Sequence, residues 1–250
     1  MSYLHLVDQA RTLRQDTFMA FVEHGEAHLG GSFSMIELLI ALFEEIMEED
    51  DKFILSKAHA AFPFYLLLKS RGYKPKISTH LELDSDNGIH CTTGSLGHGL
   101  PMAIGMSLAR SLKNMKGTIY VMISDGECQE GTTWESLLIG SKHKLNNITV
   151  LVDYNKIQAL TTLNEGLPLD DLELKFKAFN WDCDVIDDGH SFDEIIRVLK
   201  MRKNNMKPRI VIANTIKSKG IKQFENDPRW HARKLKGDEL ELGKRELGIL

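Results

Sequence analysis

The stretch TIYVMISDGECQEGTTWE, residues 118–135, places an acidic residue and a glycine directly after a run of apolar residues. A second stretch, NITVLVDYNKIQ (147–158), has a similar apolar run that ends on an aspartate and an asparagine. Short apolar runs rich in β-branched residues are typical of strands buried on both faces of a parallel sheet. The polar side chains therefore lie where two such strands are expected to end.

Asp125 and Asn155 are the polar residues at these two strand ends, and their numbers differ by 155 − 125 = 30. That separation is the length of one strand–helix–strand unit. Ligands of parallel α/β sheets bind at the carboxyl ends of the strands, so we expect the two side chains to meet at one edge. Taken singly, the Asp-Gly pair is also typical of a turn. Asp153 and Asn155, taken singly, are also typical of residues that cap the following segment. The joint spacing favours a ligand site.

The chemistry of this edge indicates a phosphate bound through magnesium. Carboxylate and amide oxygens are ligands that Mg²⁺ prefers. Gly126 lets backbone approach a ligand without a Cβ in the way. The helix expected from residue 133 places its N-terminal end nearby, where an anion is favoured.

The rest of the chain alternates between helix and strand patterns, which predicts a parallel sheet flanked by helices on both faces. A glycine-containing turn is expected at 28–33. The pattern Ser-x-x-Glu predicts a capping box at Ser34 and Glu37, and another at the start of 191–200. The expected helices are 4–23, 35–47, 61–73, 100–112, 133–143 and 191–200, and the expected strands begin near 53 and cover 118–124, 148–154, 181–187 and 209–215.

Composition favours a single globular domain and argues against several function classes. The chain has 250 residues, of which 42% are hydrophobic, enough for one sizeable core. Its formal net charge is −4 and it has no basic tract, so nucleic-acid or membrane-surface binding has no compositional support. The three cysteines form no Cys-x-x-Cys pair, which argues against a disulfide framework or a zinc site. With neither a long apolar segment nor a signal-peptide pattern, we expect a cytoplasmic protein.

The two paired motifs resemble the signature of thiamin-diphosphate enzymes, and the chain is similar to the transketolase family in particular. Other stretches that carry the resemblance are AHLGGSFSMIELLIAL, FILSKAHAAFPFYLLLKSRGY, CTTGSLGHGLPMAIGMSLA and NTIKSKGIKQFENDPRWHARKLKGDE. They occur in the family's order and cover nearly all of the chain. The resemblance implies a single diphosphate-binding domain over 1–250, with the thiamin-diphosphate-binding fold. The pyrimidine-type module is then expected on a separate chain, in a hetero-oligomer that is most simply α2β2.

The resemblance also implies roles for individual residues. Asp125, the side-chain oxygen of Asn155 and the carbonyl of Ile157 are expected to bind Mg²⁺, or Ca²⁺ or Mn²⁺ in its place. The residues expected to contact the diphosphate or the thiazolium ring are His59, Gly94, Ser95, Leu96, Gly126, Asn155 and His231.

Three of the ten histidines fall in stretches similar to the family's catalytic segments. His28 lies in AHLGG, His231 follows DPRW, and His80 lies eight residues before Gly88. The resemblance implies that they face the substrate's hydroxyl and carbonyl oxygens. Histidines in such positions can transfer protons, because their ordinary pKa lies near neutrality.

Some residues depart from the family pattern. Ser124 replaces a glycine, His98 stands where glutamine is common, and Leu29 replaces a proline. The loop 74–87 is the least similar part and is expected to face the substrate, so the departures bear on the identity of the sugars. Glu130 matches an acid at the family's subunit contact, although a surface glutamate near a helix start is an equally good interpretation.

Three functions are compatible with these features. The first is the diphosphate-binding subunit of a transketolase-like enzyme that transfers a two-carbon ketol unit from a ketose to an aldose. The second is a related enzyme subunit, of the deoxyxylulose-phosphate synthase type or one that decarboxylates 2-oxo acids. The third is a non-catalytic cofactor-binding subunit that regulates a partner. The motif histidines favour the first, with sugars or sugar phosphates as substrates.

Overall fold

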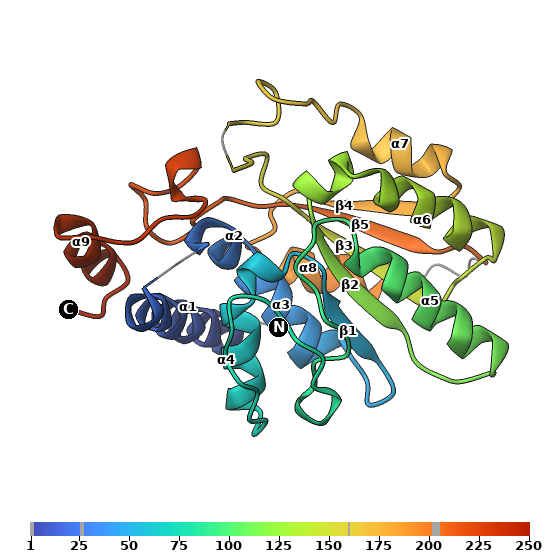
Figure 1. The fold of residues 1–250 in the computed structure, drawn as a ribbon, viewed down its shortest axis with the longest axis horizontal. Coiled ribbons are helices and arrows are strands. Elements are labelled where there is room, and N and C mark those ends of the chain that lie inside the picture. The colour runs from blue at the N-terminus through green and yellow to red at the C-terminus, as the bar shows by residue number, and fades with distance from the viewer. Residues whose placement is uncertain (1–2, 26–27, 160, 202–205) are drawn as a thin grey trace.

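The computed structural model describes residues 3–25, 28–159, 161–201 and 206–250. This described part contains a five-stranded, all-parallel sheet in the order β1-β2-β3-β5-β4 (Figure 1). The fold class predicted from the sequence is therefore confirmed. The strands are β1 Lys52–Leu55, β2 Ile119–Ser124, β3 Ile148–Tyr154, β4 Asp182–Ile186 and β5 Arg209–Asn214.

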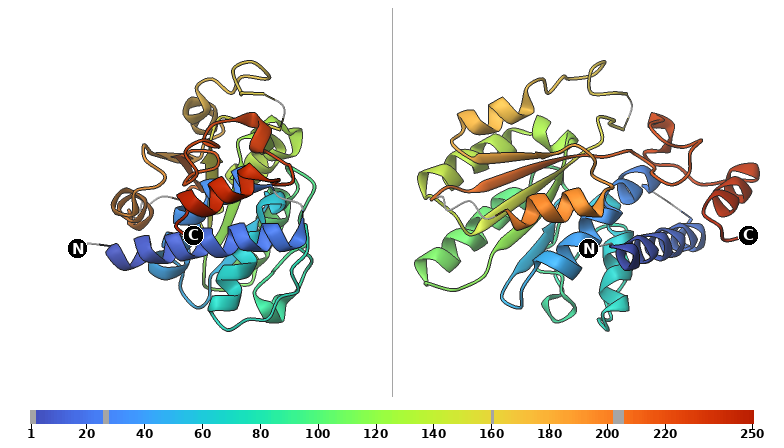
Figure 2. Two further views of the ribbon diagram at one scale, coloured as in Figure 1. Left: turned by 90° about the vertical axis from the view of Figure 1, so that its left-hand side faces the viewer. Right: turned by 180° about the vertical axis from the view of Figure 1, so that it is seen from behind.

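Helices cover both faces of this sheet, as the two further views show (Figure 2). One face is covered by α1 Leu4–His24, α3 Ile36–Ala41, α4 Phe62–Ser70 and α8 Phe192–Lys200. The other is covered by α5 Gly99–Leu112, α6 Gly131–Lys142 and α7 Leu172–Ala178. The remaining helical segments are α2 Leu29–Ser34, a π-helical turn Leu42–Ile46, the 3₁₀ turns Ala58–Ala60, Ser85–Asn87, Gly126–Gln129 and Pro228–Trp230, and α9 Asp238–Glu246.

The central strands read as continuous apolar runs because they are buried on both sides. Met122 and Leu151 pack into the core on the α1 side of the sheet. Their neighbours Val121 and Val150 pack into the core on the α5 side. Successive side chains of a strand point to opposite faces, so each face needs its own apolar set.

The turn predicted at 28–33 is wrong, because the structure has the helix α2 over Leu29–Ser34. A Cβ added at Gly30 would lie 2.8 Å from the Cγ and Cε atoms of Lys217, and one added at Gly31 would lie 3.3 Å from Nε2 of His59. Close packing within a helix, rather than turn geometry, therefore accounts for Gly30, and Gly31 packs closely against the His59 ring.

The capping box predicted at Ser34 and Glu37 is also wrong. The next helix begins at Ile36 without a side-chain cap. The Ser34 hydroxyl donates to Asp153 instead, and Glu37 forms buried contacts described below. The predicted helix 35–47 also changes to π-helical geometry from Leu42 onward.

The cap predicted at the start of 191–200 is confirmed, since the Ser191 hydroxyl accepts a hydrogen bond from the Glu194 amide at 3.4 Å. The other expected elements lie within a few residues of their predicted bounds. Across the described ranges, no helix combines the length and apolarity needed to cross a bilayer.

Candidate functional site

A cavity of about 320 Å³ lies at the carboxyl ends of β1, β2 and β3. Most of the residues predicted for the site line it, although they come from segments far apart in the sequence. Those that line it are His28, His59, Gly94, Leu96, Asp125, Gly126, Asn155, Ile157 and His231. A larger hollow of about 740 Å³ lies at the opposite edge of the sheet and contains none of them. Ligands of parallel α/β sheets bind at the carboxyl ends of the strands, and the polar residues line the smaller cavity, so both observations indicate the smaller cavity as the ligand site.

Asp125 is buried at the end of β2, with 2% of its surface exposed. Its carboxylate accepts hydrogen bonds from the backbone N–H of Lys156 at 2.6 Å and of Gly126 at 2.8 Å. Burial, together with the nearby carboxylate of Asp153, raises the pKa of Asp125 to about 6. A buried carboxylate beside another one is stabilised by a bound cation.

The donor set at this edge fits a hard divalent cation. Asn155 is buried and follows β3 directly, and its side-chain oxygen accepts from the Ile157 amide at 3.2 Å. No group of three His, Cys, Asp or Glu side chains that could hold a metal occurs among the described residues. A metal here would thus be bound by one carboxylate, amide-type oxygens and oxygens of its ligand, a set that suits Mg²⁺.

Gly126 gives independent support for a ligand at this edge. Apart from the two chain neighbours of Gly126, the nearest atom of the described residues to a Cβ added there would be Oγ of Ser124, at 3.8 Å. Packing within the chain therefore does not require a glycine. Gly126 lines the cavity, so its backbone, whose N–H donates to Asp125, can be approached closely by a phosphate oxygen.

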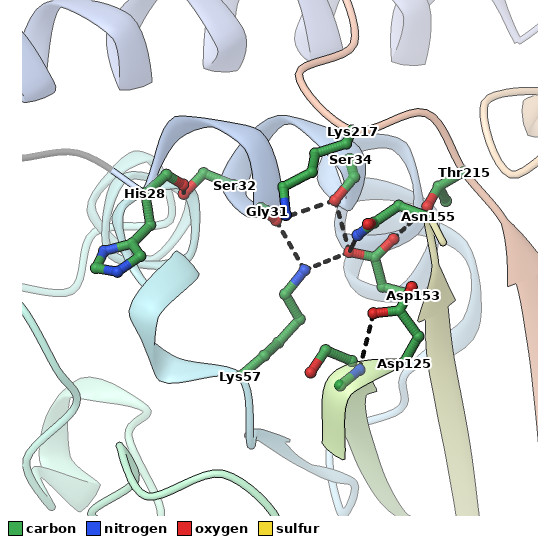
Figure 3. Close-up of polar contacts among 12 residues, drawn as sticks. His28, Gly31, Ser32, Ser34, Lys57, Asp125, Asp153, Asn155, Thr215 and Lys217 are labelled. Atoms are coloured by element: carbon green, nitrogen blue, oxygen red, sulfur yellow. Dashed lines mark hydrogen bonds and ion pairs between the residues drawn. The ribbon is translucent and has the colours of Figure 1, made fainter. Parts of the chain in front are cut away.

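A buried ion pair between Lys57 and Asp153 lies next to Asn155 at the strand ends (Figure 3). The Lys57 ammonium pairs with the Asp153 carboxylate and donates to the Gly31 carbonyl at 2.8 Å. The hydroxyl groups of Ser34 and Thr215 also donate to Asp153. Burial alone would raise the pKa of Asp153, but Lys57 and the hydroxyl donors together lower it. Asp153 therefore stays ionised and ties the ends of β1, β3 and β5 to α2.

A second buried carboxylate, Glu127, holds the glycine-rich loop TTGSLGHG (residues 92–99) in place. It accepts hydrogen bonds from the Gly97 amide at 3.0 Å, the Ser124 amide at 2.8 Å and the Ser56 hydroxyl. The Ser124 hydroxyl also lies 3.3 Å from the same carboxylate. The serine that departs from the family pattern thus contributes to this network and leaves Asp125 undisturbed.

Three histidines form a cluster at one wall of the cavity. The ring centroids of His28 lie 5.3 Å from His59 and 5.4 Å from His231, and those of His59 and His231 are 5.6 Å apart. Burial, then the charge of Lys57, lowers the pKa of His59 well below its ordinary value. Burial, then the charge of Lys217, lowers the pKa of His231 to about 3. His59 and His231 are therefore uncharged at neutral pH and act as hydrogen-bonding groups.

Two predicted residues lie outside the lining of the cavity. His80 is exposed, and its ring lies against Gly94, where an added Cβ would be 3.1 Å from the ring. Ser95 is exposed in the loop between two lining residues. His98 is also exposed, and its ring nitrogen lies 3.0 Å from the Leu96 carbonyl. Glu130 lines the cavity at the start of α6, where its role at a subunit contact stays a prediction.

The lysines of the segments SKAHA and TIKSKG, Lys57 and Lys217, are not among the site residues predicted from the sequence. Lys57 and Lys217 are almost fully buried, with 0% and 2% of their surfaces exposed. A lysine two or three residues after the end of an apolar strand is the signal that could have identified both, because that position lies at the ligand-binding edge of the sheet and lysine is rarely buried without a partner.

Comparison with known proteins identifies the family. Residues 4–250 match the family described as "Transketolase, thiamine diphosphate binding domain". The chain belongs to the transketolase family. It is 33% identical to one subunit of the apulose-4-phosphate transketolase of Actinobacillus succinogenes, over 99% of this chain and 97% of that one. It is 35% identical to a 6-deoxy-6-sulfo-D-fructose transketolase subunit of a Clostridium species, over 93% and 92%.

The solved structures agree on the fold. The transketolase of Campylobacter jejuni superposes with a TM-score of 0.86 at 24% identity, over 99% of this chain. This chain spans only 43% of that transketolase. The predictions of a subunit of transketolase type and of a thiamin-diphosphate-binding domain are thus confirmed at the level of the family. The roles predicted for single residues stay predictions.

Proposed function

We propose that the chain is the diphosphate-binding subunit of a two-chain transketolase, which transfers a two-carbon ketol unit from a ketose to an aldose. One observation carries the proposal. The chain matches relatives named as transketolase subunits over nearly their whole length, but it spans less than half of a one-chain transketolase. Because this chain and the named subunits match over nearly their whole lengths, and because the site lies at the strand ends, we propose that this chain binds the diphosphate and that a second chain supplies the rest of the active site.

In this proposal, Asp125, Asn155 and the Ile157 carbonyl bind Mg²⁺, and the Gly126 amide approaches the diphosphate. The Ile157 carbonyl also accepts a hydrogen bond from Lys217 at 2.7 Å, and its second lone pair is available to a metal. When bound, thiamin diphosphate supplies a carbon nucleophile that also acts as an electron sink. The protein's own contribution is to hold the diphosphate and to place hydrogen-bonding groups around the substrate.

The histidine cluster is proposed to contact the sugar and the diphosphate. His28 and His231 line the cavity beside His59 and can give or accept hydrogen bonds at the hydroxyl and carbonyl oxygens of a sugar. His80, at the rim on Gly94, is proposed to reach substrate that enters over the loop 74–87. The two relatives act, by their names, on a phosphorylated and a sulfonated sugar. We propose a ketose of the same anionic class.

A second chain is proposed to supply the pyrimidine module, in an α2β2 assembly, because the relatives that this chain matches over nearly their whole length are themselves named as transketolase subunits. The surface of α5 and α6 is the proposed contact, since these two neighbouring helices expose Met102, Leu138 and Ile139. Large apolar side chains exposed on neighbouring helices are typical of interaction surfaces. Glu130 lies at the same edge.

Purification of the chain alone and together with a pyrimidine-module chain tests the proposal. Ketol transfer between sugar pairs should need both chains, Mg²⁺ and thiamin diphosphate. Turnover by this chain alone would refute the two-chain assignment. Release of CO₂ from pyruvate without ketol transfer would favour a decarboxylating enzyme instead. Cofactor binding without turnover of any sugar or 2-oxo acid would favour a regulatory subunit.

A further inference from the structure

Lys217 connects the metal edge of the cavity to the histidine cluster. Its ammonium nitrogen lies 2.7 Å from the Ile157 carbonyl, 3.3 Å from the Gln158 carbonyl and 2.9 Å from Nδ1 of His231. An ammonium group has three N–H donors and no acceptor. The three neighbours match these three donors, which requires Nδ1 of His231 to be the acceptor.

The path of the Lys217 side chain is built into the fold. The side chain is 2% exposed, and Gly30 of α2 leaves the space through which it passes. A Cβ at Gly30 would meet both the Lys217 side chain at 2.8 Å and the Trp230 carbonyl at 3.0 Å. The Ser218 amide donates to the Gly30 carbonyl at 3.1 Å, which fixes the backbone on which the lysine stands.

We infer that Lys217 is a positioning residue that fixes the tautomer of His231, so that the ring carries its proton on Nε2 and presents that N–H to the cavity. An uncharged imidazole whose Nδ1 accepts a hydrogen bond must carry its proton on Nε2. No hydrogen bond within the described part of the chain uses Nε2 of His231. The ring therefore serves as a hydrogen-bond donor toward an oxygen of the diphosphate or the sugar.

This inference rests on the proposed function for what the donor contacts, but the tautomer itself can be measured without turnover. The probe is the full chain with ¹⁵N-labelled histidine, studied by long-range ¹H–¹⁵N correlation at neutral pH. These spectra distinguish Nδ1–H, Nε2–H and doubly protonated rings. A His231→Gln variant assigns the signals. The expected result is an Nε2–H ring at His231, both in the chain alone and with Mg²⁺ and thiamin diphosphate added.

The Lys217→Met variant removes the ammonium and keeps the length of the side chain. Its His231 signals should shift toward the Nδ1–H form or toward exchange between the two tautomers. Lys219→Met is the matched control. It removes the same charge two positions along the chain, and the Lys219 side chain makes no hydrogen bond within the described residues. The control should leave the His231 signals unchanged.

An Nδ1–H or doubly protonated His231 in the unmodified chain would overturn the inference, and this holds even if Lys217→Met fails to fold. Unchanged His231 signals in a folded Lys217→Met variant would also overturn it. In the assembled enzyme, Lys217→Met should lower kcat by about 10- to 100-fold, with a smaller change in KM. If no ketol transfer is found for the unmodified assembly, the proposed function fails while the tautomer result stands by itself.

Discussion

At the scale of single residues, the site depends on carboxylates that are almost inaccessible to water. Asp125 is 2% exposed and Asp153 is fully buried. Two lysines, Lys57 and Lys217, lie close enough to lower the cost of these charges. Burying a carboxylate without a partner costs several kcal/mol, so such groups persist where a cation or a ligand compensates them.

Asp125→Asn should weaken magnesium-dependent binding of thiamin diphosphate by roughly 100-fold or more in the assembled enzyme, because it removes the carboxylate from the proposed metal ligands. The variant should fold, since it also removes the repulsion between two buried carboxylates. Titration calorimetry with Mg²⁺ present measures the affinity. Asp170→Asn, an exposed acid, is the control and should bind normally. Equal affinities in the two variants would disprove the metal assignment.

Glu37 offers a test of buried charge away from the cavity. Its carboxylate pairs with the Arg14 guanidinium at 2.6 Å and with the His190 ring at 2.9 Å. Burial alone would raise the pKa of Glu37, but Arg14 and His190 lower it below the ordinary 4.5. A lowered pKa means that this ionised group stabilises the fold above about pH 4.5, and that the stabilisation is lost as the pH falls through the lowered pKa.

Arg14→Met should therefore lower the free energy of unfolding by about 3 kcal/mol at neutral pH, since it leaves a buried carboxylate short of its cation. The loss should shrink as the pH falls below 4.5 and through the lowered pKa of Glu37, because a protonated Glu37 needs no cation. Urea unfolding at neutral pH and at a series of pH values below 4.5 measures this difference. Arg11→Met, on the exposed side of the same helix, should change stability by less than about 0.5 kcal/mol. A loss that does not depend on pH would point to packing alone.

At the scale of elements, the strands and their ends could be predicted from the sequence, whereas α2 could not. The strands have a local signature, and the rule for parallel sheets then places Asp125 and Asn155 together. The two glycines of α2 have the same local pattern as a turn. Gly30 packs against the side chain of Lys217, 217 − 30 = 187 residues away, and Gly31 packs against the ring of His59, so no local pattern contains the reason for either glycine. The pair of Lys57 and Asp153, 96 residues apart, was missed for the same reason.

Two helical glycines give a matched test of this interpretation. Gly30→Ala should destabilise the chain by about 1–3 kcal/mol, because the new Cβ overlaps Lys217 and a backbone carbonyl. Gly105→Ala, within α5, meets nothing within 4 Å and should stabilise the chain alone by up to about 1 kcal/mol. Thermal and urea unfolding measure both. Stabilisation by Gly30→Ala would contradict the packing role.

At the scale of the whole molecule, one face of the α5–α6 layer is proposed to meet the partner chain. Leu138→Glu should weaken association with the pyrimidine-module chain by at least about tenfold, since it places a charge in an apolar contact. Leu4→Glu is the control, because Leu4 is similarly exposed, at 68%, but lies on the opposite layer. Analytical ultracentrifugation of the mixed chains measures association. Equal effects of the two substitutions would place the contact elsewhere.

The loop 74–87 contributes no residue to the lining of the cavity, and it differs from the groups that anchor the ligand in how little of it is buried. The anchoring groups are buried at strand ends, whereas most of this loop is exposed and is tied to the core by few contacts, such as the Tyr65 hydroxyl on the His80 carbonyl at 2.9 Å. Mutations at the exposed positions of the loop therefore cost the fold little, whereas Pro75 and Leu81 are buried. Under the proposed function, a lineage could exchange one sugar for another through these exposed positions while it inherits the cofactor anchor unchanged, and a directed-evolution library for new acceptors belongs there.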